Sequence, residues 1–161
     1  MTSAPKSFSI KSFGCQMNVY DGERMAELLG DTGMVPAATG EDADLVVLNT
    51  CHIREKAAEK AYSDIGRLRR EDGSRPLIAL AGCVAQAEGA EAAKRSPMID
   101  MVVGPHAYHR LPAMIEDAVR GRRPVDTDMP AISKFDAMPP RRRSAPSAFL
   151  TVQEGCDKVC T

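Results

Sequence analysis

The chain has 161 residues, with 21 basic and 22 acidic side chains and a hydrophobic fraction of 43%. This composition is typical of one folded domain, and it excludes a wholly disordered chain and a small disulfide scaffold. No apolar run approaches the roughly 18 residues of a membrane span, and residues 1–6 lack the apolar run of a signal peptide. We therefore expect a cytoplasmic protein, and its balanced charge does not by itself indicate a nucleic-acid partner.

Apolar strands alternate with amphipathic helices along the first 120 residues. In chain order, the expected elements are a strand over Ser7–Phe13, a helix from Asn18 to Leu29, strands at Met34–Val35 and Leu45–Leu48, a helix over Ile53–Arg70, a strand over Leu77–Ala81, a helix over Ala85–Arg95, a strand over Met101–Val103 and a helix over Pro112–Arg120. Asn18 is the expected N-cap of the first helix. The fully apolar run Leu45–Leu48 is typical of a strand that is buried on both faces of a parallel sheet. The alternation predicts an α/β fold of the flavodoxin-like or Rossmann-like kind, with a parallel sheet flanked by helices.

The composition changes after the last expected helix. Prolines become frequent from residue 124 onward, and Arg141, Arg142 and Arg143 follow one another. This pattern is typical of a linker, and Phe149–Val152 then resembles the first strand of a new unit. We expect a domain over residues 5–122, a linker over 123–147 and the truncated start of a second domain over 148–161.

Three of the five cysteines each follow the end of an expected strand and precede an expected helix. Cys15, Cys51 and Cys83 are 36 and 32 residues apart, so their spacing matches no local metal motif. Parallel strands place their carboxyl ends along one edge, so the three thiols could meet there, where helix N-termini favour thiolates. Three thiolates suit an iron–sulfur cluster or zinc. The plain alternative is that these cysteines are small buried apolar residues.

The remaining candidate residues carry weaker signals. Cys156 and Cys160 form a Cys-x₃-Cys pair, which is either part of a metal-binding loop or incidental. His52 could be a ligand or proton carrier, but a solvated side chain at a helix start is the more common case. Three arginine clusters could contact RNA phosphate or lie on solvated surface, and they are at residues 67, 69 and 70, at 120, 122 and 123, and at 141–143.

Four motifs in the same order resemble the radical-SAM methylthiotransferases. They are Phe-Gly-Cys-Gln-Met-Asn at 13–18, Asn-Thr-Cys-His-Ile-Arg-Glu-Lys-Ala at 49–57, Ala-Gly-Cys-Val-Ala-Gln at 81–86 and Gln-Glu-Gly-Cys-Asp-Lys-Val-Cys at 153–160. The resemblance covers the whole chain. The residues that follow Cys15 are most similar to the branch of the family that modifies tRNA.

The resemblance implies an enzyme with two [4Fe–4S] clusters that uses S-adenosylmethionine. Cys15, Cys51 and Cys83 match the ligands of an auxiliary cluster, whereas Cys156 and Cys160 match two of three ligands of the radical-SAM cluster. The implied reaction adds a methylthio group to carbon 2 of N6-isopentenyladenosine beside the tRNA anticodon, with electrons from a flavodoxin or ferredoxin. The cofactors carry the bond-breaking, and the protein positions them.

The chain departs from that family pattern because the third radical-SAM cysteine and the rest of the partial TIM barrel are not in it. The fragment is therefore expected to bind only the auxiliary cluster and to be inactive by itself. The alternatives are a zinc-binding or thiol-redox α/β module, an RNA-binding adaptor, and a sister methylthiotransferase that acts on another substrate.

Overall fold

The computed structural model describes residues 3–14, 16–51, 55–129 and 140. Its strands are β1 (Ser7–Ser12), β2 (Val35–Pro36), β3 (Leu45–Thr50), β4 (Leu77–Gly82), β5 (Met101–Val103) and β6 (Val125–Asp126). Its helices are α1 (Gln16–Asp31), α2 (Glu55–Arg67), α3 (Cys83–Glu88), α4 (Ala90–Arg95), the 3-10 helix η1 (Pro105–Arg110) and α5 (Leu111–Val119). Most of the expected linker and the expected strand at 149–152 lie outside the described residues. None of the described helices combines the length and apolarity needed to cross a membrane.

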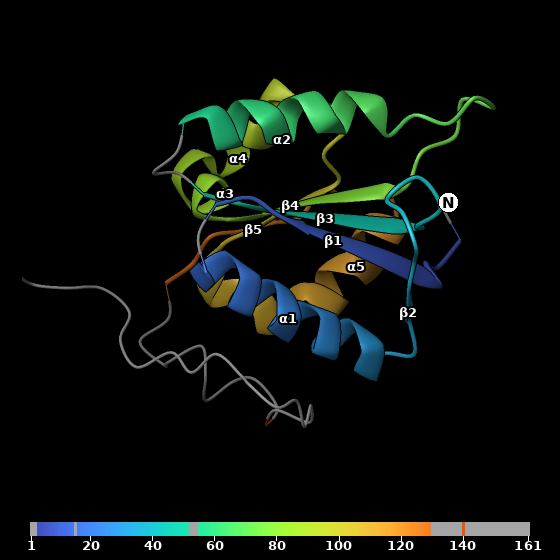
Figure 1. Ribbon diagram of the computed structural model, residues 1–161, viewed down its shortest axis with the longest axis horizontal. Coiled ribbons are helices and arrows are strands. Elements are labelled where there is room, and N and C mark those ends of the chain that lie inside the picture. Colours follow the sequence, from blue (N-terminus) through green and yellow to red (C-terminus); the bar gives the residue numbers. More distant parts are fainter. Residues whose placement is uncertain (1–2, 15, 52–54, 130–139, 141–161) are drawn as a thin grey trace, which may run out of the picture.

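The six strands form one parallel sheet in the order β2-β1-β3-β4-β5-β6. Helices α1 and α5 cover one face of the sheet, and α2, α3 and α4 cover the other (Figure 1). The predicted α/β fold with a parallel sheet is therefore confirmed, and the order of the first five strands is the flavodoxin-like one. In this order the chain reverses direction across the sheet between β1 and β3, and ligands of such folds bind at the carboxyl ends of the strands near that reversal.

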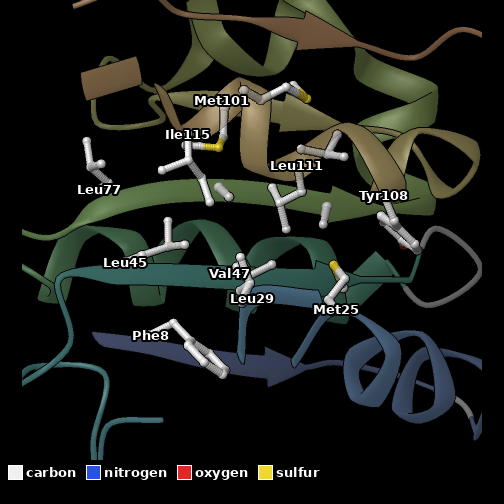
Figure 2. Packing of buried hydrophobic residues seen from close by; sticks show 14 of the residues in the cluster. Phe8, Met25, Leu29, Leu45, Val47, Leu77, Met101, Tyr108, Leu111 and Ile115 are labelled. Carbon is white, nitrogen blue, oxygen red and sulfur yellow. The ribbon is translucent and has the colours of Figure 1, made fainter. Parts of the chain in front are cut away.

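Both faces of the central strands are buried. Alternate side chains of β3 enter two separate cores, with Leu45 and Val47 facing α1 and α5, and Val46 and Leu48 facing α2. Figure 2 shows the first core, in which Tyr108 of η1 and Met25 of α1 lie toward the carboxyl ends of the strands. Burial of both faces leaves the edges of the sheet as the places where polar groups can converge.

Two helix boundaries differ from the sequence-based expectation. The prediction that Asn18 caps the first helix is wrong, because α1 begins at Gln16 and the buried Asn18 amide instead donates to the Phe13 carbonyl at 3.0 Å. The helix predicted over Ile53–Arg70 ends at Arg67, because the guanidinium of Arg70 donates to the main-chain carbonyls at positions 41 and 43.

Three further features were not foreseen, and one of them is the 3-10 helix η1 before α5. The single helix predicted over Ala85–Arg95 is two helices that meet at Gly89, whose φ is +50°. Strand β6 lies inside the expected linker and pairs with β5, with Val102 opposite Val125. A strand of two residues carries too little sequence pattern to be recognised, since its place depends on the partner strand.

Candidate functional site

The carboxyl edge of the sheet brings the second and third sequence motifs together. Thr50, the last residue of β3, pairs with Gly82, the last residue of β4. Cys51 and Cys83 are the next residues after this pair. Because neighbouring strands lie about 4.8 Å apart, the two cysteines leave the sheet side by side. The prediction that each follows a strand end is confirmed for these two residues.

Cys51 lies in a close contact with the first motif. Its exposed fraction is 4%, and a Cβ placed on Gly14 would lie 2.5 Å from the Cys51 Cβ and 3.2 Å from its Sγ. Gly14, with a φ of +121°, therefore packs its backbone directly on the Cys51 side chain. Cys83 is exposed at the first residue of α3. Cys15, which follows Gly14 in the sequence, lies outside the described residues.

Gly82 permits the close approach of β3 and α3. Its φ is 89° and its ψ is −157°, a combination that is essentially restricted to glycine. A Cβ at this position would lie 2.4 Å from the Thr50 carbonyl oxygen and 2.7 Å from Asn49 Oδ1. The Gly-Cys sequence at 82–83 is thus required by packing at the edge, and it keeps Cys83 close to the end of β3.

Buried amides hold the loop that carries the first motif. Asn49 donates its Nδ2 hydrogen to the Asn18 carbonyl at 2.6 Å, and its Oδ1 accepts from the Tyr108 hydroxyl at 3.4 Å. The Phe13 main-chain N–H donates to the Asn49 carbonyl at 2.8 Å. Thr50 Oγ1 donates to the Ala81 carbonyl at 2.6 Å. These bonds tie the ends of β1, β3 and β4 to α1 and η1.

Sequence reasoning missed the structural part played by Asn49, Thr50 and Tyr108. The available signal was their position, because Asn49 and Thr50 extend an apolar strand with polar residues and still precede a cysteine. Polar residues in a buried strand need partners, which predicts a hydrogen-bond network at this end. Tyr108 gave no such signal, since its partner lies 59 residues away in the sequence.

The electrostatics of the same edge are set partly by η1, which follows β5. Burial lowers the pKa of His109, the neighbouring Arg110 lowers it further, and Asp126 partly opposes them. At neutral pH this imidazole is therefore uncharged. The cation in this region is Arg110, whose guanidinium pairs with the Asp126 carboxylate at 2.6 Å.

The described part of the edge supplies thiols but not a complete ligand set. Among the residues that the structure describes, no three Cys, His, Asp or Glu side chains are gathered to hold a metal ion. Cys51 and Cys83 follow the paired ends of two neighbouring strands, whereas Cys15 lies outside the described residues. Cysteine sulfur is a ligand type of zinc and of iron–sulfur clusters, so the residues present fit the predicted class of site.

The other sequence candidates divide into described and undescribed residues. Arg70 and Arg123 donate to main-chain carbonyls, and Arg122 pairs with Asp117, which explains these members of two clusters as structural. Arg141–Arg143, His52, Cys156 and Cys160 lie outside the described residues.

Comparisons with known proteins agree with this geometry. The model of the uncharacterized protein family UPF0004 matches residues 7–104, which is more than half of the chain. The chain belongs to this family. The match begins at β1 and ends just after β5, so it contains the first three motifs and the edge where two of them meet.

The chain is also similar to curated relatives that share one name. It is 71% identical over 160 residues to the tRNA-2-methylthio-N(6)-dimethylallyladenosine synthase of Novosphingobium aromaticivorans, covering 99% of the chain and 36% of that protein. It is 71% identical over 161 residues to the same-named protein of Sphingopyxis alaskensis, and 61% identical over 163 residues to that of Cereibacter sphaeroides. The coverage is again 99% of the chain and 36% or 37% of each relative. The predicted resemblance is confirmed, and the chain spans about a third of the length of these relatives.

Proposed function

We propose that this chain is the N-terminal, cluster-binding region of a radical-SAM enzyme that methylthiolates tRNA. The observation that supports it best is the combination of high identity to the named synthases with the pairing of Thr50 and Gly82, the residues directly before Cys51 and Cys83, at the carboxyl edge. The relatives' name indicates the product, 2-methylthio-N6-dimethylallyladenosine in tRNA. The substrate is accordingly N6-isopentenyladenosine beside the anticodon, modified at carbon 2.

Cys15, Cys51 and Cys83 are the ligands that we assign to an auxiliary [4Fe–4S] cluster. Cys15 is bonded to Gly14, and the Gly14 backbone packs on Cys51. Because consecutive α-carbons lie about 3.8 Å apart, this contact supports the assignment of Cys15 as the third ligand. Three thiolates on a cubane leave one iron without a protein ligand, which suits the binding of a sulfur-containing group. The protein's own contribution is to hold the thiolates in place through Gly14, Gly82 and the amides of the edge.

The remaining assignments follow from the resemblance. Cys156 and Cys160 are assigned to the radical-SAM cluster, with a third cysteine that this chain does not contain. The domain boundaries that we propose follow the sequence-based ones except that β6 belongs to the sheet, so the cluster-binding domain runs from residue 5 to the end of β6, followed by the linker up to 147 and the start of the radical-SAM domain at 148–161. The bound clusters and S-adenosylmethionine would supply the radical and sulfur-transfer chemistry. We also propose a flavodoxin or ferredoxin as the reductant. The proposed location is the cytoplasm, where tRNA is found.

Anaerobic reconstitution of the 161-residue chain with iron and sulfide tests the ligand assignment. We expect roughly four irons and four sulfides per chain, with visible charge-transfer absorbance. Separate Cys15→Ala, Cys51→Ala and Cys83→Ala variants should each lose that absorbance. The matched control is the double variant Cys156→Ala and Cys160→Ala, which should retain it.

Three results would contradict the proposal. Stoichiometric zinc without sulfide would indicate a zinc-binding module. Retention of the cluster in the Cys15→Ala variant would show that Cys15 is not a ligand. Tight binding of tRNA by the 161-residue chain without a cluster, lost when Arg141–Arg143 are neutralised, would indicate an RNA-binding adaptor. For the full-length protein, mass spectrometry of digested tRNA measures the methylthio group directly.

A further inference from the structure

Gln86 joins the third motif to the chain segment that leaves the sheet. It lies in α3 three residues after Cys83, and residues at positions i and i+3 of a helix share a face. Its Nε2 donates to the main-chain carbonyl of Thr127 at 2.7 Å, across 41 residues of sequence. The contact therefore holds the segment after β6 against the side of α3 on which Cys83 lies.

Gly104 makes room for this contact. A Cβ at Gly104 would lie 2.2 Å from Gln86 Oε1 and 3.2 Å from the Thr127 Cα. The φ of Gly104 is −70°, so its backbone conformation does not require glycine. The close approach of Gln86 and Thr127 is therefore the reason that a side chain does not fit at this position.

Two more contacts fix the same segment. The Gly104 N–H donates to the Asp126 carbonyl at 2.7 Å, and the Arg110 guanidinium pairs with the Asp126 carboxylate. These groups hold β6 against β5 and η1, whereas Gln86 reaches past the strand to Thr127. Gln86 thus holds the residue that follows β6 against α3.

We infer that Gln86 is a positioning residue that fixes the exit of the linker beside Cys83. This inference rests on the proposed function, in which the auxiliary cluster and the radical-SAM site must face one another. The contact that assigns this role to Gln86 is its hydrogen bond to the Thr127 carbonyl, so we expect it to act through the segment that it holds. Release of Thr127 leaves the cluster ligands in place and changes the placement of the domain that follows.

Two independent variants break the contact in the 161-residue chain. Gln86→Leu removes the donor at similar volume, and Gly104→Ala forces the flexible end of the Gln86 side chain to move. The Thr127→Ala variant is the matched control, because the acceptor is a main-chain carbonyl. The readout is hydrogen exchange of the amide at position 104, which donates to Asp126.

We expect about two- to tenfold faster exchange at position 104 in both variants, as loss of one hydrogen bond predicts. Exchange in β3 and β4 should remain that of the wild type, as should every amide of Thr127→Ala. If the amide at position 104 exchanges at the wild-type rate in both Gln86→Leu and Gly104→Ala, the hydrogen bond from Gln86 to Thr127 does not hold the segment and the inference is wrong. Equally faster exchange throughout the sheet would show a general loss of stability and would also overturn the inference.

The full-length enzyme tests the consequence for the reaction. In Gln86→Leu we expect wild-type iron, sulfide and visible absorbance, together with at least a fivefold lower kcat for tRNA methylthiolation. Wild-type kcat with a loaded cluster would refute the positioning role and leave the proposed function standing. Failure of the wild-type protein to assemble a cluster would refute the proposed function. The exchange experiment would still show whether Gln86 holds Thr127 in place.

Discussion

Replacement of Gly82 by alanine tests most directly whether the carboxyl edge of the sheet depends on the close packing of residue 82 against Thr50. The added Cβ would lie 2.4 Å from the Thr50 carbonyl oxygen and 2.9 Å from the Thr50 nitrogen. Both are main-chain atoms at the end of the central strand β3, so they cannot rotate away as a side chain can. The alanine must also adopt a φ of 89°, a conformation that side chains disfavour.

The two costs can be estimated separately. A non-glycine residue in this backbone conformation costs about 1–3 kcal/mol. Forcing a methyl group into a packed site costs about 1–3 kcal/mol in addition. We therefore expect Gly82→Ala to lower the free energy of unfolding by about 2–6 kcal/mol, against a usual total of about 5–15 kcal/mol. Any relaxation must separate Thr50 from residue 82, so iron loading should fall as well.

Urea denaturation followed by circular dichroism measures the change in unfolding free energy. The matched control is Gly66→Ala in α2, where an added Cβ meets no atom within 4 Å and the φ is not in the left-handed region. That variant should gain about 0.5–1 kcal/mol, because glycine is a poor residue in a helix. A Gly82→Ala protein within about 0.5 kcal/mol of the wild type would refute the packing argument, since that is the spread of ordinary surface substitutions.

Three further predictions concern other described residues. Asn49→Ala should lower the unfolding free energy by about 1–3 kcal/mol in urea denaturation, because it removes a buried hydrogen bond to the Asn18 carbonyl and the acceptor of the buried Tyr108 hydroxyl. The main-chain N–H of Lys6 donates to the Asp44 carboxylate and lowers its pKa below the ordinary 3.8. The difference in unfolding free energy between the wild type and Asp44→Asn should therefore be complete above about pH 5 and should disappear as the pH falls below 3.8, as urea denaturation at several pH values would measure. Tyr62→Phe should cost about 1 kcal/mol in thermal or urea unfolding, because the Tyr62 hydroxyl donates to the Glu88 carboxylate and joins α2 to α3.

The parallel sheet could be predicted from the sequence because its strands are short apolar runs with two buried faces. Leu45–Leu48 contains no polar residue, and its exposed fractions are 0–2%. The positions of Cys51 and Cys83 followed from the same pattern, because a cysteine directly after such a run must lie at the carboxyl edge. The assignments of all five cysteines as cluster ligands remain predictions.

The amide network could not be predicted, since its bonds join residues that share no local pattern. Asn18 is a reasonable helix cap by its residue type, yet its side chain donates to Phe13 and its carbonyl accepts from Asn49. The contact with Asn49 depends on β1 and β3 being neighbours, which is a property of the whole sheet. The short strand β6 was missed for the same reason, because its two residues are defined by their pairing with β5.

The distribution of crowded glycines gives an independent reason to place function at the carboxyl edge. Among the described glycines, an added Cβ would come within 3.0 Å of another atom at four positions, which are Gly14, Gly22, Gly82 and Gly104. Gly14, Gly82 and Gly104 directly follow or end a strand at that edge, and Gly22 contacts Ser12, the last residue of β1. At Gly30, Gly33, Gly66, Gly73 and Gly121 an added Cβ meets nothing within 4 Å. A fold held together by its two cores alone does not need close backbone contacts concentrated at one end of its strands, whereas a site that must hold thiolates at fixed separations does.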